Sequence, residues 1–186
     1  MSNLIRRLRG MTQAGTADYS VAGTNWWTDD QLQEVLDANR VDLNHVRVVE
    51  SPEYEGGTLI YRTFYLGYEN LEEVSTGADA FDVEDGRGDT VGTALYTPDY
   101  IRGVVRFSND YSGTALYIRG RSYNLNAAAA QVWREKAAWR ADYVDFGSDG
   151  QRFSQSQWFN HCWRMAAGYD AAQGVTSAQL YRSDLA

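Results

Sequence analysis

A predicted helix that begins at Asn124 or Asn126 constrains this chain more than any other segment. Residues 122–140 read SYNLNAAAAQVWREKAAWR, and the run of alanines has the highest intrinsic helix propensity available. At 100° per residue, one sector is expected to face solvent, and it holds Gln131, Arg134, Glu135, Ala138, Asp142 and Asp145. Apolar residues cover most of the remaining circumference, which is typical of a helix at the centre of its fold.

Two cations interrupt that apolar surface. Lys136 and Arg140 lie in its middle, and a cation removed from water needs a partner, because an isolated buried charge is strongly destabilising. One interpretation is that both side chains extend along neighbouring elements to water, or pair with carboxylates of the same chain. The other is that a second subunit covers this face. It makes the following residues candidates for a subunit interface: Trp133, Lys136, Trp139, Arg140 and Tyr143.

The rest of the chain predicts an α+β fold. Thr28 and Gln31 fit a T-x-x-Q capping box for an N-terminal helix that stops at Asn39. Residues 57–121 are rich in β-branched and aromatic residues separated by Gly, Asn and Asp, which is typical of a β meander or small antiparallel sheet. Within it, the two strands that flank 108–113 are expected to pair as a hairpin.

We therefore expect a helical bundle, made of the N-terminal helix and a C-terminal helical pair, with the β meander inserted. The first helix of the pair is expected to end near Phe146, and the second to open with a capping box at 154–157. The expected organisation is an N-terminal arm (1–25), a helical bundle (26–56 and 122–174), an inserted β subdomain (57–121) and a C-terminal tail (175–186).

Composition and charge argue against several classes of protein. The net charge of -8 over 186 residues disfavours a dedicated nucleic-acid binder, although an acidic wall suits a channel through which DNA slides without sticking. One Cys and two His exclude an internal disulfide framework and offer little material for a zinc site. The chain has no apolar run long enough for a membrane span and no secretory signal, so we expect it in a reducing cytoplasm.

Catalytic motifs are missing from the sequence, and we expect no enzyme, cofactor or metal. His161 and Cys162 are adjacent on a predicted helix, where neighbouring side chains point about 100° apart and cannot act as base and nucleophile. The acidic loop 82–89 lacks the spacing of an EF-hand, and its Arg87-Gly88-Asp89 is a short match that arises easily by chance. One alternative left open is a β domain that binds glycans or depends on calcium.

Two segments resemble a known family. The segment 123–169, with its Tyr-Asn-Leu opening, alanine-rich helix with a Lys-Ala-Ala step, Phe-Gly-Ser-Asp-Gly turn and Ser-Gln helix start, resembles the C-terminal helical pair of head-tail connector (adaptor) proteins of tailed bacteriophages. The stretches LIRRLRGMTQAGTADYS and WTDDQLQEVLDAN are similar to the opening arm and first helix of those proteins. The resemblance covers about residues 1–40 and 122–170.

The resemblance implies a structural virion protein without catalytic activity. Such adaptors form a ring, usually a dodecamer, below the portal at the head-tail junction, and continue the DNA channel to the neck and tail. The implied partners are further copies of the chain, the portal protein, a downstream neck or tail protein, and genomic DNA that passes through during ejection without sequence-specific binding. Assembly would take place in the host cytoplasm, with no membrane partner.

The same resemblance makes the C-terminal tail a portal-docking segment. Its candidate docking residues are Val175, Leu180, Tyr181, Arg182 and Leu185. The β insertion 57–121 departs from compact adaptors, which are mostly helical, and leaves open another phage neck or tail-completion component.

Overall fold

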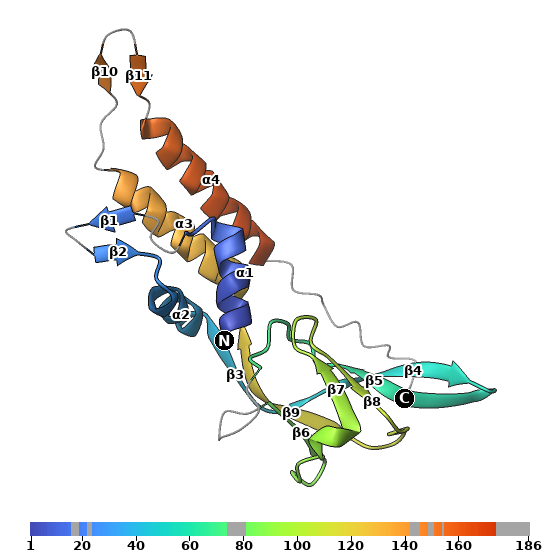
Figure 1. Ribbon diagram of the computed structural model, residues 1–186. Helices are drawn as coiled ribbons and strands as arrows, with labels where there is room; N and C mark the ends of the chain where they lie inside the picture. The colour runs from blue at the N-terminus through green and yellow to red at the C-terminus, as the bar shows by residue number, and fades with distance from the viewer. Residues whose placement is uncertain are drawn as a thin grey trace. The chain divides into compact units, whose positions relative to one another are not determined.

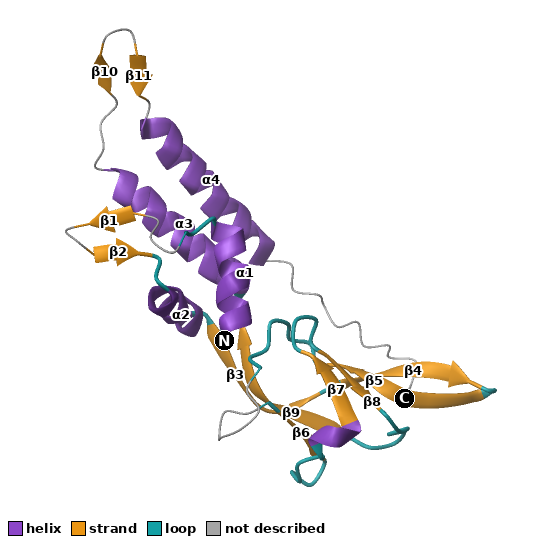
Figure 2. Cartoon of the chain, viewed as in Figure 1, coloured by secondary structure: helices purple, strands orange, loops and turns teal. Residues whose placement is uncertain are grey.

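The computed structural model describes residues 1–15, 19–21, 24–73, 81–141, 146–148, 151–153 and 155–173 (Figure 1). The chain divides into two compact units, Met1–Leu125 and Asn126–Ala186. The described residues form four α-helices and two larger antiparallel sheets, which confirms the expected α+β class (Figure 2).

The first unit opens with two helices and a small hairpin. Helix α1 spans Ser2–Thr12, strands β1 (Tyr19–Val21) and β2 (Thr24–Trp26) pair antiparallel, and α2 spans Asp29–Ala38. The sequence predicted an N-terminal arm over residues 1–25, whereas residues 2–12 form the full helix α1, with Leu4, Ile5 and Leu8 buried. It packs against α2, and its Arg9 forms an ion pair with Asp29 at 2.6 Å.

The capping box of α2 is confirmed. The Thr28 hydroxyl accepts a hydrogen bond from the Gln31 backbone N–H at 3.3 Å, and the Gln31 side chain accepts one from the Thr28 N–H at 3.1 Å. These bonds satisfy backbone donors that a helix start leaves without partners. Asn39 caps the other end, as expected.

Two antiparallel sheets make up the rest of this unit. The three-stranded sheet has the order β3-β9-β6 and the four-stranded sheet the order β4-β5-β8-β7. Their bounds are β3 Arg40–Arg47, β4 Val49–Glu55, β5 Thr58–Tyr65, β6 Asp82–Asp85, β7 Tyr96–Asp99, β8 Val104–Phe107 and β9 Leu116–Tyr123, with a 3-10 turn η1 at Thr93–Leu95. Both sheets contribute to one apolar core, in which Phe64, Val105 and Ile118 are almost fully buried.

The prediction of a hairpin around 108–113 is wrong. Strands β8 and β9 exist, but β8 lies between β5 and β7, and β9 lies between β3 and β6, so neither has an edge left for the other. Asp110 explains where the connection goes instead, because its side chain accepts the backbone N–H of Tyr61 at 2.8 Å and ties the loop to β5. A turn-rich sequence specifies a reversal of the chain, but the shared core decides which strands pair.

The β region also begins earlier than expected. Strands β3 and β4 fall within residues 26–56, which the sequence assigned to the helical bundle. A bulge at Asn44 and His45, where His45 has a φ of 51°, breaks the alternation of β3. Pro52 lies within β4, and proline is tolerated there because β4 is an edge strand. Both features obscured the strand pattern.

The second unit is a helical pair. Helix α3 (Leu125–Ala141) and helix α4 (Gln155–Gln173) are joined through the small antiparallel strands β10 (Phe146–Ser148) and β11 (Gln151–Phe153). The first of these helices was expected to continue to Phe146, which instead belongs to β10. The intervening residues 142–145 and the position 154 of the second predicted capping box lie outside the described residues.

A buried polar cluster fixes the end of β9 just before α3. The Tyr123 hydroxyl donates to Glu72 at 2.8 Å, and Arg121 lies 3.8 Å from the same carboxylate. Burial, followed by the hydrogen bond and charge of Glu72, raises the pKa of Tyr123 above its usual value of 10.0. Folding therefore favours the neutral phenol, and this contribution to stability is present below pH 10 and is lost as the pH rises beyond it.

We expect Tyr123→Phe to lower the free energy of unfolding at pH 7 by about 1–3 kcal/mol, because Glu72 loses a buried donor. The difference between wild type and variant should narrow above pH 10, where only the wild type still has this phenol to ionise. Urea unfolding followed by circular dichroism between pH 7 and 11 measures both. A difference that stays constant over this range would contradict the prediction.

Candidate assembly surfaces

The interior of the helical pair contains two of the residues that the sequence nominated for an interface. Trp133 is completely buried and packs in a core with Ala137, Cys162 and Ala166. The edge of its indole meets His161 at a centroid distance of 5.7 Å. Residues 128–130 and Val132 are also buried, so most of the circumference of α3 is covered within the single chain, as its sequence pattern predicts.

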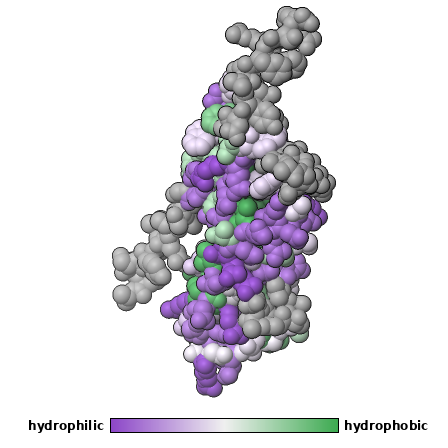
Figure 3. Space-filling model, turned by 90° about the vertical axis from the view of Figure 1, so that its left-hand side faces the viewer, coloured by the Kyte–Doolittle hydropathy of each residue, from purple (hydrophilic) through white to green (hydrophobic). Residues whose placement is uncertain are grey.

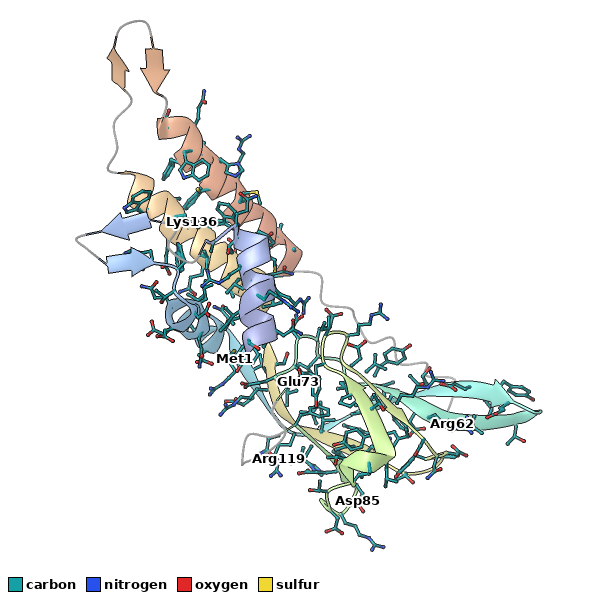
Figure 4. All side chains as sticks on the ribbon, viewed as in Figure 1. Met1, Arg62, Glu73, Asp85, Arg119 and Lys136 are labelled. Atoms are coloured by element: carbon teal, nitrogen blue, oxygen red, sulfur yellow. The ribbon has the colours of Figure 1, made fainter. Side chains whose placement is uncertain are left out.

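Lys136 is a buried cation on α3 (Figure 4). Its residue is only 4% exposed, and its Nζ lies 5.0 Å from the centroid of the Trp133 ring. An ammonium over an indole face is attracted by the ring quadrupole, and this attraction strengthens when water is excluded. By contrast, Arg134 is exposed and forms a surface ion pair with Asp170 on α4 at 2.5 Å.

The structure describes only part of the other residues that the sequence nominated. Trp139 is half-buried on α3, and Arg140 belongs to the same helix, although its side chain is not described. Tyr143 lies outside the described residues. So do all the candidate portal-docking residues: Val175, Leu180, Tyr181, Arg182 and Leu185.

Large apolar side chains that stay exposed mark candidate interaction surfaces. Among the described residues they are Val41, Val49, Tyr54, Leu59, Tyr65, Leu95, Ile101, Trp158 and Trp163. The face drawn in Figure 3 is otherwise largely hydrophilic, with apolar residues gathered in small areas. Some of these exposed residues form two local clusters, one on α4 and one on the β4–β5 hairpin.

The first cluster is aromatic and lies on α4. Trp163 is 55% exposed and stacks on Phe159, one turn earlier, with an angle of 12° between the ring planes and 6.2 Å between centroids. Arg164 follows it and is exposed, and its Nε donates to the carbonyl of Asn160 at 3.4 Å. No carboxylate of the described residues forms an ion pair with Arg164. Trp158, on the same helix, is 43% exposed.

The second cluster lies on an arm formed by β4 and β5. Strand β5 pairs with β8 only over Thr63–Tyr65, whereas β4 and β5 pair along their full lengths, so the hairpin extends as a two-stranded ribbon (Figure 1). Tyr54 and Leu59 are opposite each other in register, and they are 75% and 50% exposed. We name residues 52–61, which include this pair, the β arm.

Charges surround this apolar pair. Glu55 forms a surface ion pair with Arg62 at 2.9 Å and keeps 62% of its side chain exposed. Glu53 accepts a hydrogen bond from the hydroxyl of Thr63 at 2.5 Å. With Glu50, three carboxylates lie on β4, the outer strand of its sheet, where charges and Pro52 discourage the addition of another strand.

A polar cluster on the three-stranded sheet does not form a recognisable catalytic site. His45 stacks on Tyr117 at 3.9 Å, and its Nδ1 lies 3.0 Å from the carboxylate of Glu84. Glu84 also lies 3.6 Å from Nε of Arg119, so it links the three strands. Cys162 is completely buried in the core of the helical pair.

The acidic loop 82–89 is held by its own backbone. The side chain of Asp85 accepts the N–H groups of Arg87 at 2.8 Å and Asp89 at 3.0 Å. These two bonds lower the pKa of Asp85 below its usual value. The carboxylate thus serves the turn, and no group of three or more His, Cys, Asp or Glu side chains in the described ranges is arranged to hold a metal ion.

No family model, curated protein or solved structure matches this chain. Within the described ranges, the helices are too short or too polar to cross a membrane.

Proposed function

We propose that this chain is a head-tail adaptor, a structural protein that assembles into a ring below the portal of a tailed bacteriophage. The observation that carries the proposal is the presence of two unlike exposed apolar surfaces, the β arm and the aromatic face of α4. When unlike surfaces of identical copies meet, the contact is heterologous, and a series of such contacts closes into a ring if the rotation permits.

Charge and sequence add support. A net charge of -8 gives a channel wall that repels DNA weakly if the carboxylates face inward, which suits passage without sticking. The helical pair formed by α3 and α4 lies in the segment whose sequence resembles the helical pair of such adaptors. On this proposal, the segment 175–186 docks into the portal, and the ring passes the channel on to the neck or tail protein.

The test is assembly with the portal protein encoded in the same genome. Mass photometry and negative-stain imaging should show a ring of this chain on the portal, while the chain alone is a monomer or associates weakly. A chain truncated before residue 175 should keep its circular dichroism spectrum and lose co-sedimentation with the portal. A wild-type chain that stays monomeric with the portal would reject the proposal.

The same experiment separates an adaptor from another neck or tail-completion protein. An adaptor ring binds the portal directly. A neck or tail-completion component binds the ring below it and ignores isolated portal, so portal binding decides between the two classes.

A further inference from the structure

The β arm leaves its sheet at a bulge. The register of β4 against β5 shifts between Ser51 and Pro52, so Arg62, labelled in Figure 4, has no partner on β4. A bulge bends its strand and interrupts the ladder of hydrogen bonds, and a proline supplies no N–H to that ladder. Strand β8 gives no support there, because its pairing with β5 begins at Thr63. Pro52 and Arg62 therefore mark a place where the hairpin can bend at little cost, and we name this place the hinge.

One loop holds the arm beyond the hinge. The side chain of Asp110 accepts the backbone N–H of Tyr61 at 2.8 Å, and the N–H of Tyr111 donates to the carbonyl of Tyr61 at 2.9 Å. The loop thus takes the place of a third strand for one residue, after β8 has ended at Phe107. The ring centroids of Tyr111 and Phe107 are 4.2 Å apart, which anchors the loop on the core. We name the two bonds to Tyr61 the latch.

The arm has few other ties. Among the described residues, the hydrogen bonds and ion pairs of 54–60 stay within the hairpin. Glu53 forms the other tie across the hinge, because its carboxylate accepts the hydroxyl of Thr63 at 2.5 Å and lies 3.9 Å from Arg106 on β8. A two-stranded ribbon is only marginally stable in water, and exposed bonds of this kind each add little. The direction of the arm therefore depends on the latch and on Glu53.

We propose that the β arm is a movable element. The latch holds it in the direction that the structure shows, and release of the latch lets it pivot about the hinge. The exposed pair of Tyr54 and Leu59 then changes its direction relative to the rest of the sheet. The part of β5 below the hinge stays in place, because Phe64 is completely buried and pairs with Val105 of β8. The latch acts within one chain, so its test is independent of the adaptor proposal.

The distance between two spin labels measures the direction of the arm. Thr58 lies at the end of the arm and Thr97 on β7, and both are exposed, whereas the native Cys162 is fully buried. A labelled Thr58→Cys, Thr97→Cys chain should give one narrow distance distribution by pulsed electron paramagnetic resonance. Adding Asp110→Ala removes the acceptor of the Tyr61 N–H, and it should broaden the distribution or add a second distance.

Two substitutions are matched controls. Asp110→Asn keeps a side-chain oxygen that accepts the same N–H, so it should behave like wild type. Asn109→Ala changes an exposed neighbour that forms no hydrogen bond with the arm among the described residues, and it should also leave the distribution narrow. Hydrogen exchange gives a second readout. In Asp110→Ala, amides between 54 and 60 should exchange about fivefold faster or more, while the amide of Phe64 keeps its rate.

Any of three results would overturn the proposal. A wild-type distribution as broad as that of Asp110→Ala would mean that the latch does not hold the arm. Equally narrow distributions and equal exchange rates in the two chains would mean that the arm is rigid without the latch. Faster exchange at Phe64 in Asp110→Ala would show that the sheet itself opens, which also rejects a pivot at the hinge.

Discussion

Lys136→Glu should lower the free energy of unfolding of the helical pair by more than about 3 kcal/mol. The ammonium of Lys136 lies 5.0 Å from the ring centroid of Trp133 in a site that is only 4% exposed. A carboxylate at this position would replace an attractive cation with an anion over the negative face of the indole, and it would be buried without its solvation. Thermal and urea unfolding, followed by tryptophan fluorescence, measure the loss.

Two variants control for the change of charge. Lys136→Met keeps a long side chain and removes the charge without burying a carboxylate, so it should cost clearly less than Lys136→Glu. Arg134→Glu reverses an exposed cation on the same helix and breaks its ion pair with Asp170, at a cost of about 1 kcal/mol or less.

The same variant decides between the two interpretations of this cation. If Lys136 is neutralised by a neighbouring subunit, Lys136→Glu should leave the isolated chain as stable as wild type and impair only assembly. If groups of the same chain stabilise the Lys136 ammonium, Lys136→Glu should destabilise the isolated chain. The near-complete burial of Lys136 and Trp133 within one chain leads us to expect the second result.

Features with a local cause were predictable from the sequence. The capping box of Thr28 and Gln31 depends on residues three positions apart, and the burial of α3 follows from its own periodicity. The same periodicity identified Lys136 as a cation on a face that should be apolar. Its contact with the Trp133 ring is also local, because residues three apart on a helix are neighbours.

Pairing between distant strands was not predictable in this way. The turn-rich connection at 108–113 satisfied the rules for a hairpin, yet β8 and β9 are separated because each completes a different sheet around the common core. The polar sequence of β4, with Pro52 and three glutamates, concealed the β arm. The sequence signal that could have revealed it is the Gly56-Gly57 pair, because two glycines between strands are typical of a tight hairpin. In the structure both have positive φ.

Gly103→Ala is expected to be among the most destabilising single substitutions in the two larger sheets, and it should lower the free energy of unfolding by at least about 4 kcal/mol. Gly103 lies just before β8 with a φ of +63°, and a Cβ there would lie 1.7 Å from the carbonyl oxygen of Tyr68. This neighbour is backbone, so it cannot rotate away. The carbonyl of Gly103 also accepts the N–H of Leu66 at 2.9 Å, so a shift at this position would pull apart the segments that follow β5 and precede β8.

Gly113→Ala is the matched control, because it separates the steric clash from the backbone conformation. Gly113 has a comparable φ of +72°, but no atom lies within 4 Å of the position that its Cβ would occupy. Only the left-handed conformation then opposes the alanine, at a cost of about 1–2 kcal/mol. Urea unfolding by circular dichroism, with hydrogen exchange at Leu66, should therefore give a much lower free energy of unfolding for Gly103→Ala than for Gly113→Ala. Equal losses at the two positions would mean that the segment carrying Tyr68 yields easily, and that this connection does not fix the four-stranded sheet from which the β arm extends.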